Sequence, residues 1–343
     1  MSEADNERLA TGKLPLEMLA GLLRQCCQTL DPRVIVGARV GEDAAVIDFG
    51  ERFLVAKSDP VTFATDRIGW YAVHVNANDV ATTGAVPHWM LVTLLLPEGS
   101  ATRQMAEEIM GQVAAACQDL DIGVVGGHTE VTYGLPRPIV VGHLLGEVPR
   151  DRLVSTNGVR VGDAILLAGS IAEEGTALIA REHGEQARAL GVDEGTLAVA
   201  RRYLDDPGIS VVRAARLAAE AVRVHAMHDP TEGGLATGLH ELAWAAGVGL
   251  EVDGTAVPVL PACARLCAAF GIDPLGLIAS GALLIAVAPE DAALVGETYR
   301  QAGIPWAEIG RAVPRERGVC LVQDGIRQPL PRYDRDEITR LLA

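Results

Sequence analysis

Residues 72–99 have the sequence AVHVNANDVATTGAVPHWMLVTLLLPEG, which places a helix, a glycine turn and an apolar strand in direct succession. The helical spacing of apolar residues starts earlier, at Ile68, and predicts one helix over residues 68–83. The run MLVTLLLP predicts a buried strand after it. This helix and strand set the pattern that the neighbouring segments follow.

Short runs of strand type precede this helix, and strands and helices continue to alternate after it. The runs VIVGARV, AAVIDFG and RFLVAKSD are separated by Gly, Glu and Asp, as in consecutive strands with tight turns. Leucines at helical spacing predict a first helix over residues 14–30, and a later helix is predicted over 102–119. The strands IGVVGG and PIVVGHLLGEV follow. We therefore predict a leader and helix over residues 1–33 and an α+β domain over 34–150.

A polar stretch over residues 149–162 marks a change of domain. The strand AILLAG opens the second half. A helical region rich in Glu and Arg up to Tyr203, an amphipathic helix and a further helix after a glycine-bearing turn are predicted next, together with the strands VGLEVD, GALLIAVA and GVCLVQD. The predicted second α+β domain covers residues 151–325, and residues 326–343 form a C-terminal tail.

Composition excludes some classes of function. With 343 residues and 49% hydrophobic content, the chain can form two packed domains. Its net charge of −16 argues against nucleic-acid binding, because that binding needs Lys and Arg to neutralise phosphates. An acidic protein can still bind ATP through divalent cations. The polar N-terminus and the lack of a membrane-spanning run predict a cytosolic protein with reduced cysteines.

Three aspartates are the candidate metal ligands. Asp43 precedes the strand-like AAVI, Asp59 follows LVAKS, and Asp79 lies in the helix of residues 68–83. Carboxylates from three separate elements suit Mg²⁺, which takes oxygen ligands and neutralises charge during phosphoryl transfer. Spacing alone leaves solvated turn carboxylates as the alternative. Walker, G-x-S-x-G, H-E-x-x-H and G-x-G-x-x-G motifs are missing, so ATP use would need another phosphate cradle.

Several motifs in order resemble one superfamily. GEDAAVI, SDPVTF, the stretch from Ala72 to Gly99, VVGGHTEVT and HDPTEGGLATGLHELA are similar to segments of aminoimidazole ribonucleotide synthetase (AIR synthase), thiamine-monophosphate kinase, selenophosphate synthetase and the nitrile-forming hydrogenase maturation factor. The similarity covers about residues 10 to 325. It implies an α+β, two-domain fold with a C-terminal α/β sandwich, in a homodimer whose N-terminal domains share a β-barrel with nucleotides near the interface.

The resemblance also assigns roles to the motif residues. It implies that Asp43, Asp59 and Asp79 bind Mg²⁺ and ATP phosphates, with Asp43 and Asp79 as catalytic residues. Asn76 would contact the nucleotide or hold its loop, and the alternative is a helix-surface or capping amide. We expect alanine at Asp43 or Asp79 to abolish nucleotide binding and leave folding almost unchanged, as for exposed loop carboxylates.

The segment GGHTE resembles the GGHT form of selenophosphate synthetase, and it predicts nucleotide contacts by Gly126, Gly127 and Thr129. His128 would bind a phosphate or orient Thr129 as a catalytic residue, because neutral imidazole is a poor Mg²⁺ ligand. A core histidine is the alternative. Glu130 could supply a further carboxylate to the metal.

A glycine-bearing turn before a helix in the second half is a candidate anion site. Asp229, Thr231, Gly233 and Gly234 precede that helix, whose first amides attract anionic groups. We assign them to the acceptor or phosphate side, with N-capping by Asp229 or Thr231 as the alternative. Lys13 could reach a phosphate from the leader, although a solvated lysine is the simpler interpretation.

Departures from the known members guide the functional prediction. The chain ends DEITRLLA, whereas the maturation factor that its second half resembles ends in a reactive cysteine, and the leader TGKLP lacks the cysteine of selenophosphate synthetase. We therefore predict an ATP- and Mg²⁺-dependent enzyme of the maturation-factor-like branch, acting on a small carbonyl, amide or phosphate-bearing acceptor. The alternatives are a thiamine-monophosphate-kinase-like enzyme and an assembly factor that binds nucleotide without catalysis.

Overall fold

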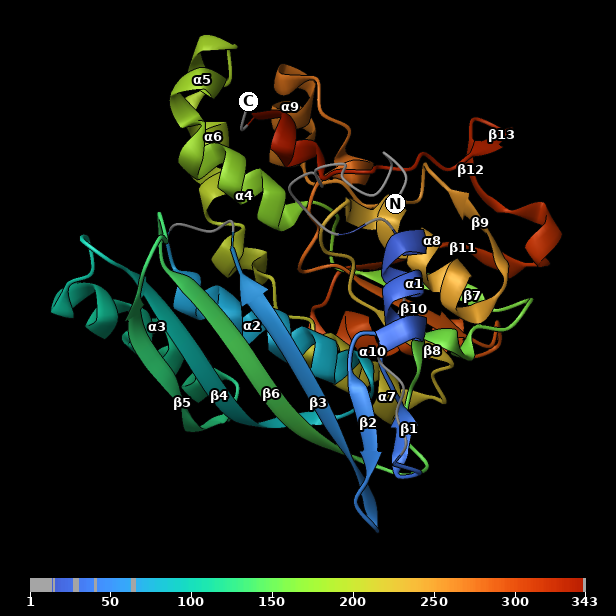
Figure 1. The fold of residues 1–343 in the computed structure, drawn as a ribbon. Helices are drawn as coiled ribbons and strands as arrows, with labels where there is room; N and C mark the ends of the chain where they lie inside the picture. Colours follow the sequence, from blue (N-terminus) through green and yellow to red (C-terminus); the bar gives the residue numbers. More distant parts are fainter. Residues whose placement is uncertain (1–13, 15, 27–30, 40–41, 63–65, 342–343) are drawn as a thin grey trace, which may run out of the picture.

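The computed structural model has two halves, each with one β-sheet and helices packed on it (Figure 1). It describes residues 14, 16–26, 31–39, 42–62 and 66–341. The first sheet has six strands in the order β1-β2-β3-β6-β4-β5. Its strands are β1 (Val34–Val36), β2 (Ala45–Asp48), β3 (Arg52–Val61), β4 (Val86–Pro97), β5 (Gly123–Thr132) and β6 (Ile139–Pro149). Most neighbours are antiparallel, and β4 with β5 is the parallel pair. The short helix α1 (Leu16–Cys26) precedes them.

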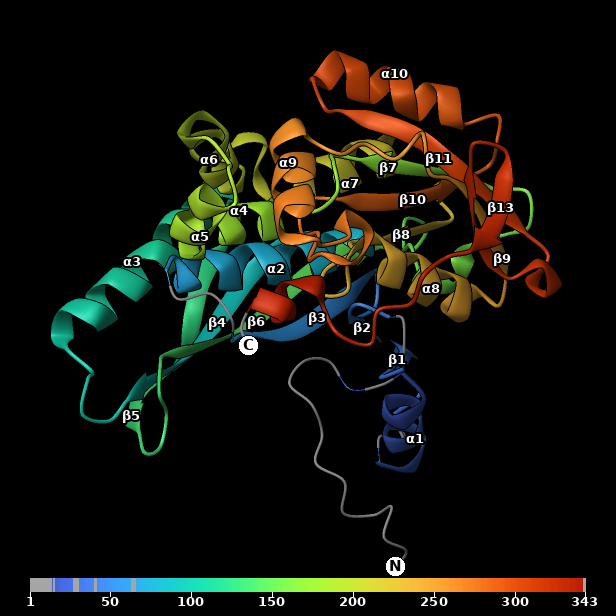
Figure 2. The same ribbon diagram turned by 90° about the horizontal axis from the view of Figure 1, so that it is seen from above.

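Helix α2 (Ile68–Thr82) lies at the centre of the molecule, between the two halves (Figure 2). Apolar and small residues surround it on nearly every side, which is the pattern of a fully buried helix. It contacts β3, β4 and β6 of its own half and α7 and β8 of the second half. Asn78 ties the halves together, because its amide donates to the carbonyl of Ile209 and accepts from the amide of Val211, each at 2.8 Å.

The other helix of the first half, α3 (Arg103–Asp119), packs beside α2 over the same face of the sheet. Alternation along the strands explains which face is covered. Phe53 and Val55 of β3 are buried toward the helices, whereas Leu54 points to the opposite face and is only half-buried. Leu91 of β4 and Leu145 of β6 are half-buried in the same way. One face of this sheet therefore carries apolar side chains that no helix covers among the described residues.

The second sheet has seven strands in the order β13-β12-β9-β11-β7-β10-β8. They are β7 (Ala164–Ala168), β8 (Ala226–His228), β9 (Gly249–Asp253), β10 (Leu283–Val287), β11 (Trp306–Val313), β12 (Val319–Gln323) and β13 (Ile326–Pro329). Helix α8 (Gly234–Ala246) packs on one face, and α7 (Val212–Ala221) and α10 (Ala292–Ala302) pack on the other. A separate helical group consists of α4 (Glu173–Glu182), α5 (Gly184–Ala189), α6 (Glu194–Arg201) and α9 (Pro261–Phe270).

The predicted α+β, two-domain fold is confirmed. The helices expected over residues 68–83 and 102–119 occur as α2 and α3. The helix expected over 14–30 is described only over Leu16–Cys26, and its last residues lie outside the described part of the chain. The expected buried strand MLVTLLLP is the C-terminal part of β4, where alternate residues are only partly buried. None of the described helices is long and apolar enough to cross a membrane.

Candidate active site at the junction of the two halves

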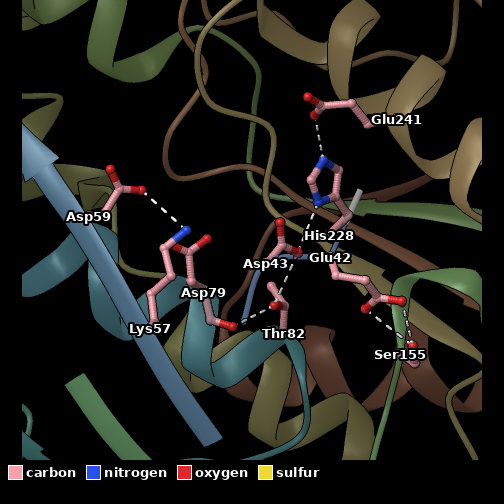
Figure 3. A network of polar contacts seen from close by, with 9 residues as sticks. All are labelled: Glu42, Asp43, Lys57, Asp59, Asp79, Thr82, Ser155, His228 and Glu241. Atoms are coloured by element: carbon pink, nitrogen blue, oxygen red, sulfur yellow. Dashed lines mark hydrogen bonds and ion pairs between the residues drawn. The ribbon is translucent and has the colours of Figure 1, made fainter. Parts of the chain in front are cut away.

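A network of charged side chains lies where β3 and α2 meet β8 (Figure 3). Lys57 and Asp59 are two residues apart on β3, so both point to the face that α2 covers. The Lys57 ammonium lies 2.9 Å from Oδ2 of Asp79 and 3.2 Å from Oδ2 of Asp59. Burial by itself lowers the pKa of Lys57, but attraction to Asp79 and the neighbouring carboxylates outweighs it and the net shift is upward. Lys57 is therefore a fixed positive charge.

Asp79 lies inside α2 and is only 5% exposed. Burial raises the pKa of its carboxyl, and the adjacent Lys57 ammonium opposes that shift. The expectation that Asp79 is an exposed loop carboxylate is therefore wrong. Because its side chain is buried against a charged partner, we no longer expect alanine at this position to leave folding unchanged.

Asp43 precedes β2, and its contacts link the charged residues around Lys57 to the second half of the chain. Its Oδ2 lies 3.0 Å from Nδ1 of His228 and accepts a 3.4 Å hydrogen bond from Thr82, whose hydroxyl also bonds to the carbonyl of Asp79. On the other side of the ring, Nε2 of His228 lies 3.0 Å from Oε2 of Glu241 in α8. Burial alone lowers the pKa of His228, but the two carboxylates reverse this and raise it well above the ordinary value.

Asp229 follows His228 directly and is 2% exposed. Neither of its carboxylate oxygens has a hydrogen-bond partner among the described residues. Burial and the nearby Asp79 and Asp43 raise the pKa of its carboxyl. Ligand atoms of Asp43, His228 and Asp229 all lie within 4.8 Å of one another. Asp229 thus belongs to the charged network as well as to the turn before α8.

Asn76 holds β3 against α2 from within the core. It is fully buried, and its amide donates to the carbonyl of Asp59 at 3.3 Å and to that of Ala72 at 2.8 Å. Gly142 of β6 leaves the space, because a Cβ there would lie 2.3 Å from the Asn76 amide nitrogen. Asn76 is therefore neither a helix-surface amide nor a cap, and it positions the backbone at Asp59.

The GGHTE segment lies on β5, at the edge of the sheet and separated from β3 by β4 and β6. Its side chains are exposed, and His128 pairs with Glu130 at 3.1 Å, so His128 is not a core histidine. The backbone requires glycine at position 127, because φ there is +147° and a Cβ would lie 1.9 Å from the Val92 carbonyl oxygen. Within one chain, Gly126, Thr129 and Glu130 do not join the carboxylate network.

The glycine turn before α8 is already bonded. Gly233, with φ +78°, is the N-cap of α8, and its amide donates to Oδ2 of Asp336 at 2.7 Å. Gly234 has φ +64° and approaches the carbonyl of Leu275 so closely that a Cβ would lie 2.5 Å from it. The N-cap is therefore not Asp229 or Thr231. The carboxylate of Asp336, in the C-terminal tail, therefore accepts the hydrogen bond of an amide that the sequence predicted to bind an anionic group. Lys13 lies outside the described residues.

Sequence reasoning missed Lys57, His228 and Glu241. Lys57 left a signal, because a lysine within an apolar strand and two positions before Asp59 shares its face. His228 and Glu241 left none beyond their place in the HDPTEGGLATGLHELA segment.

The two-domain fold agrees with comparisons to known proteins. Residues 41–148 match the N-terminal domain, and residues 160–323 the C-terminal domain, of the AIR synthase related proteins. The chain belongs to this family.

Within this family, the chain is similar to several proteins of hydrogenase maturation. The carbamoyl dehydratase HypE of Cupriavidus necator is 33% identical over 74% of this chain and 71% of its own length. A protein of Methanocaldococcus jannaschii named for hydrogenase expression and formation is 27% identical over 94% of this chain and 97% of its own length. A solved structure of hydrogenase maturation protein HypE in complex with ATP has a TM-score of 0.71 and 25% identity, covering 96% and 98% of the two chains. The predicted resemblance and the prediction of an enzyme are confirmed.

Proposed function

We propose that this chain is an ATP- and Mg²⁺-dependent enzyme that transfers a phosphoryl group to, or activates through phosphate, a small carbonyl, amide or phosphate-bearing acceptor. The observation that carries the proposal is the cluster of Asp59, Asp79 and Asp43 around the single ammonium of Lys57. Among the described residues of the network, the two basic side chains Lys57 and His228 face four aspartates, Asp43, Asp59, Asp79 and Asp229, so the site favours additional cations. The related HypE bound to ATP supports a nucleotide here.

The residues fit magnesium by their chemistry. Mg²⁺ prefers oxygen ligands and is usually held by one or two carboxylates together with phosphates and water. Asp43 and Asp59 are the best placed of the three, because their side chains keep 12% and 35% exposure while Asp79 is turned into Lys57. When bound, the ion would neutralise charge on the phosphates as the phosphoryl group leaves.

The other residues of the network would act by position. Lys57 would supply a fixed positive charge beside the phosphates, and Asn76 would hold the backbone at Asp59 so that its carboxylate keeps its place. Such a reaction needs no protein nucleophile. The described cysteines fit this mechanism, since those at 117, 263, 267 and 320 are buried and outside the network, and Cys26 is exposed on α1.

A homodimer would complete the site. The uncovered sheet face carries Leu54, Leu91 and Leu145, and exposed apolar surface of this kind is typical of an interface. Pairing through this face would bring His128 and Glu130 of β5 toward a second copy. Under this proposal the GGHTE segment serves the nucleotide bound by the partner chain.

Calorimetric titration with ATP, with and without Mg²⁺, tests the proposal on wild type, Asp59→Asn and Asp48→Asn. Asp48 is the matched control, because it pairs with Arg150 and not with Lys57. We expect Mg²⁺-dependent binding that Asp59→Asn weakens at least about 10-fold, as for a lost charged contact, and that Asp48→Asn leaves intact. Absence of binding by the wild type would contradict ATP use. Phosphate release in an acceptor screen separates an enzyme from a factor that only binds nucleotide.

A further inference from the structure

The chain continues past β13, and residues 330–341, here called the strap, fold back over the second half. Figure 2 shows the strap running from β13 past α8 toward α9. Leu330 anchors its start in the apolar cluster under α8. Near its other end, Ile338 and Leu341 pack against the cluster that contains α9. The strap therefore spans two separate apolar cores of the molecule.

Asp336, within the strap, caps α8 from outside that helix. Gly233 is the N-cap residue of α8 and has no side chain with which to bond the first amides. The Gly233 amide donates to Oδ2 of Asp336 at 2.7 Å, and the Ile338 amide donates to Oδ1 at 2.9 Å. Asp336 is 8% exposed, and its negative charge suits the start of a helix. Burial raises the pKa of this carboxyl to about 6, so it is ionised at pH 8.

The strap also supports α8 through the short 3₁₀ helix η4 (Pro274–Gly276). The Tyr333 hydroxyl donates to Oδ2 of Asp273, the N-cap of η4, at 2.5 Å. The Tyr333 ring fills the space beside Gly276, where a Cβ would lie 2.5 Å from the ring. η4 in turn lies against the start of α8, because a Cβ on Gly234 would lie 2.5 Å from a carbonyl oxygen of η4. Two routes of contact therefore lead from the strap to α8.

Helix α8 and the turn before it hold part of the charged network. His228 ends β8, Asp229 opens the turn that leads into α8, and Glu241 lies within the helix. Glu241 lies 3.0 Å from Nε2 of His228, whose Nδ1 lies 3.0 Å from Asp43. Movement at the start of α8 would therefore reach the network, and a misplacement of about 1 Å can cost about 100-fold in a site of this kind.

We propose that the strap is a built-in control element, which fixes the turn of residues 229–234 and the start of α8 while docked and loosens the charged network when released. Asp336 is the positioning residue of this element, because it acts on the site through Gly233. The effect on nucleotide binding rests on the proposed function, whereas the coupling of the strap to α8 does not.

Hydrogen exchange followed by mass spectrometry tests the coupling on the full-length chain at pH 8, without nucleotide. Asp336→Ala should speed exchange in peptides covering residues 229–240 by about 10-fold, as for a lost bond to a charged group. Asp336→Asn keeps an acceptor for the Gly233 amide and should restore most of the protection. Asp193→Ala is the matched control, because Asp193 caps α6 by accepting from the Thr196 amide at 2.9 Å. It should speed exchange in α6 and leave residues 229–240 unchanged.

Calorimetric titration of the same variants with ATP and Mg²⁺ gives a second result, which a merely structural role would not produce. Asp336→Ala should weaken binding at least about 10-fold, and Asp193→Ala should leave it intact. If Asp336→Ala does not fold, Tyr333→Phe decides, since it removes only the hydroxyl that bonds to Asp273 and should speed exchange in the same peptides to a smaller extent.

Wild-type exchange over residues 229–240 in the folded Asp336→Ala variant, or in Tyr333→Phe where that variant decides, would overturn the proposal. Faster exchange with unchanged ATP affinity would also overturn it, by showing that the strap only stabilises the fold. Absence of ATP binding by the wild type would contradict the proposed function, and the exchange measurements would then decide the coupling by themselves.

Discussion

Lys57 is the residue on which the charge balance of the site depends. Its side chain is 18% exposed and faces Asp79 and Asp59 at ion-pair distance. Removing one member of a buried ion pair leaves the other charge unpaired, which costs more than the pair itself contributes. Lys57 therefore both stabilises the fold and supplies the positive charge that holds Asp59 and Asp79 in the site.

Lys57→Met should lower the free energy of unfolding by about 3 kcal/mol in metal-free buffer, because Asp79 loses its buried partner. Urea denaturation followed by circular dichroism measures the change. The double variant Lys57→Met, Asp79→Asn should recover part of the loss. Arg103→Met is the control, since Arg103 pairs with Glu107 on an exposed helix surface and should change stability by no more than about 0.5 kcal/mol. Equal effects at the two positions would contradict the prediction.

Glu173, at the start of α4, links stability to pH away from the site. It is 1% exposed and accepts a 3.1 Å hydrogen bond from the Ser170 amide. Burial raises the pKa of this carboxyl to about 8. Between the unfolded pKa, near 4.5, and about 8 the folded state holds a proton that the unfolded state has lost, so this residue makes stability fall as pH rises through that window.

Glu173→Gln should remove that part of the pH dependence, because glutamine keeps the acceptor for Ser170 and carries no ionisable proton. Unfolding free energies of variant and wild type should agree near pH 4 and diverge toward pH 8.5, where the variant is the more stable. Glu185→Gln, at an exposed pair with Arg188, should follow the wild type at every pH. A parallel pH profile for Glu173→Gln and the wild type would show that Glu173 is ionised in the fold.

At the scale of elements, the packing of α2 on β6 and β3 sets the position of Asp59 and Asp79. Gly142→Ala should disturb it, since the new Cβ would lie 2.3 Å from the Asn76 nitrogen and 2.8 Å from Cε of Met90. We expect a loss of about 1–3 kcal/mol from overpacking and weaker ATP binding. Adding Asn76→Ala should relieve part of the destabilisation.

Gly111→Ala is the matched control for Gly142→Ala. Gly111 lies in α3, and an added Cβ meets nothing within 4 Å. Alanine should stabilise the helix there by about 0.5–1 kcal/mol. Thermal unfolding of both variants is sufficient, and a stabilising Gly142→Ala would contradict the proposed packing.

Elements were predictable where local pattern decides them. Helices over residues 68–83 and 102–119 follow from apolar spacing, and the alternating runs gave the strands. The burial of Asp79 also had a signal, because α2 is apolar or small all round. The separation of Glu130 from Asp43 had none, since the strand order that puts β4 and β6 between β3 and β5 depends on tertiary packing. For the same reason the meeting of His228 with Asp43, 185 residues apart, could not be predicted.

At the scale of the whole molecule, the proposed homodimer makes a prediction about the uncovered sheet face. Leu145 lies opposite Ala56 of β3 and Trp89 of β4 on that face. Leu145→Glu should convert the dimer to a monomer in sedimentation velocity, because pairing would bury an unpaired carboxylate in each copy.

Gln118→Glu adds the same charge on the exposed side of α3, which packs over the opposite face, and should leave the dimer intact. A monomeric wild type would contradict the homodimer and leave the role of β5 unexplained. Dissociation by Leu145→Glu with full ATP binding would show that each nucleotide site lies within one chain.

Asn78 and Asp79 are consecutive residues of α2 with separate duties. Asn78 fastens the loop from Ile209 to Val211 of the second half, and Asp79 reaches Lys57 in the first. This limits how the gene can recombine with those of its relatives. A chimera that joins this first half to the second half of a relative keeps Asn78 but loses the 209–211 loop to which Asn78 is hydrogen-bonded. If α2 moved to fit a new loop, Asp79 would rotate away from Lys57. Exchange of the halves would therefore have to carry α2 and the 209–211 loop together.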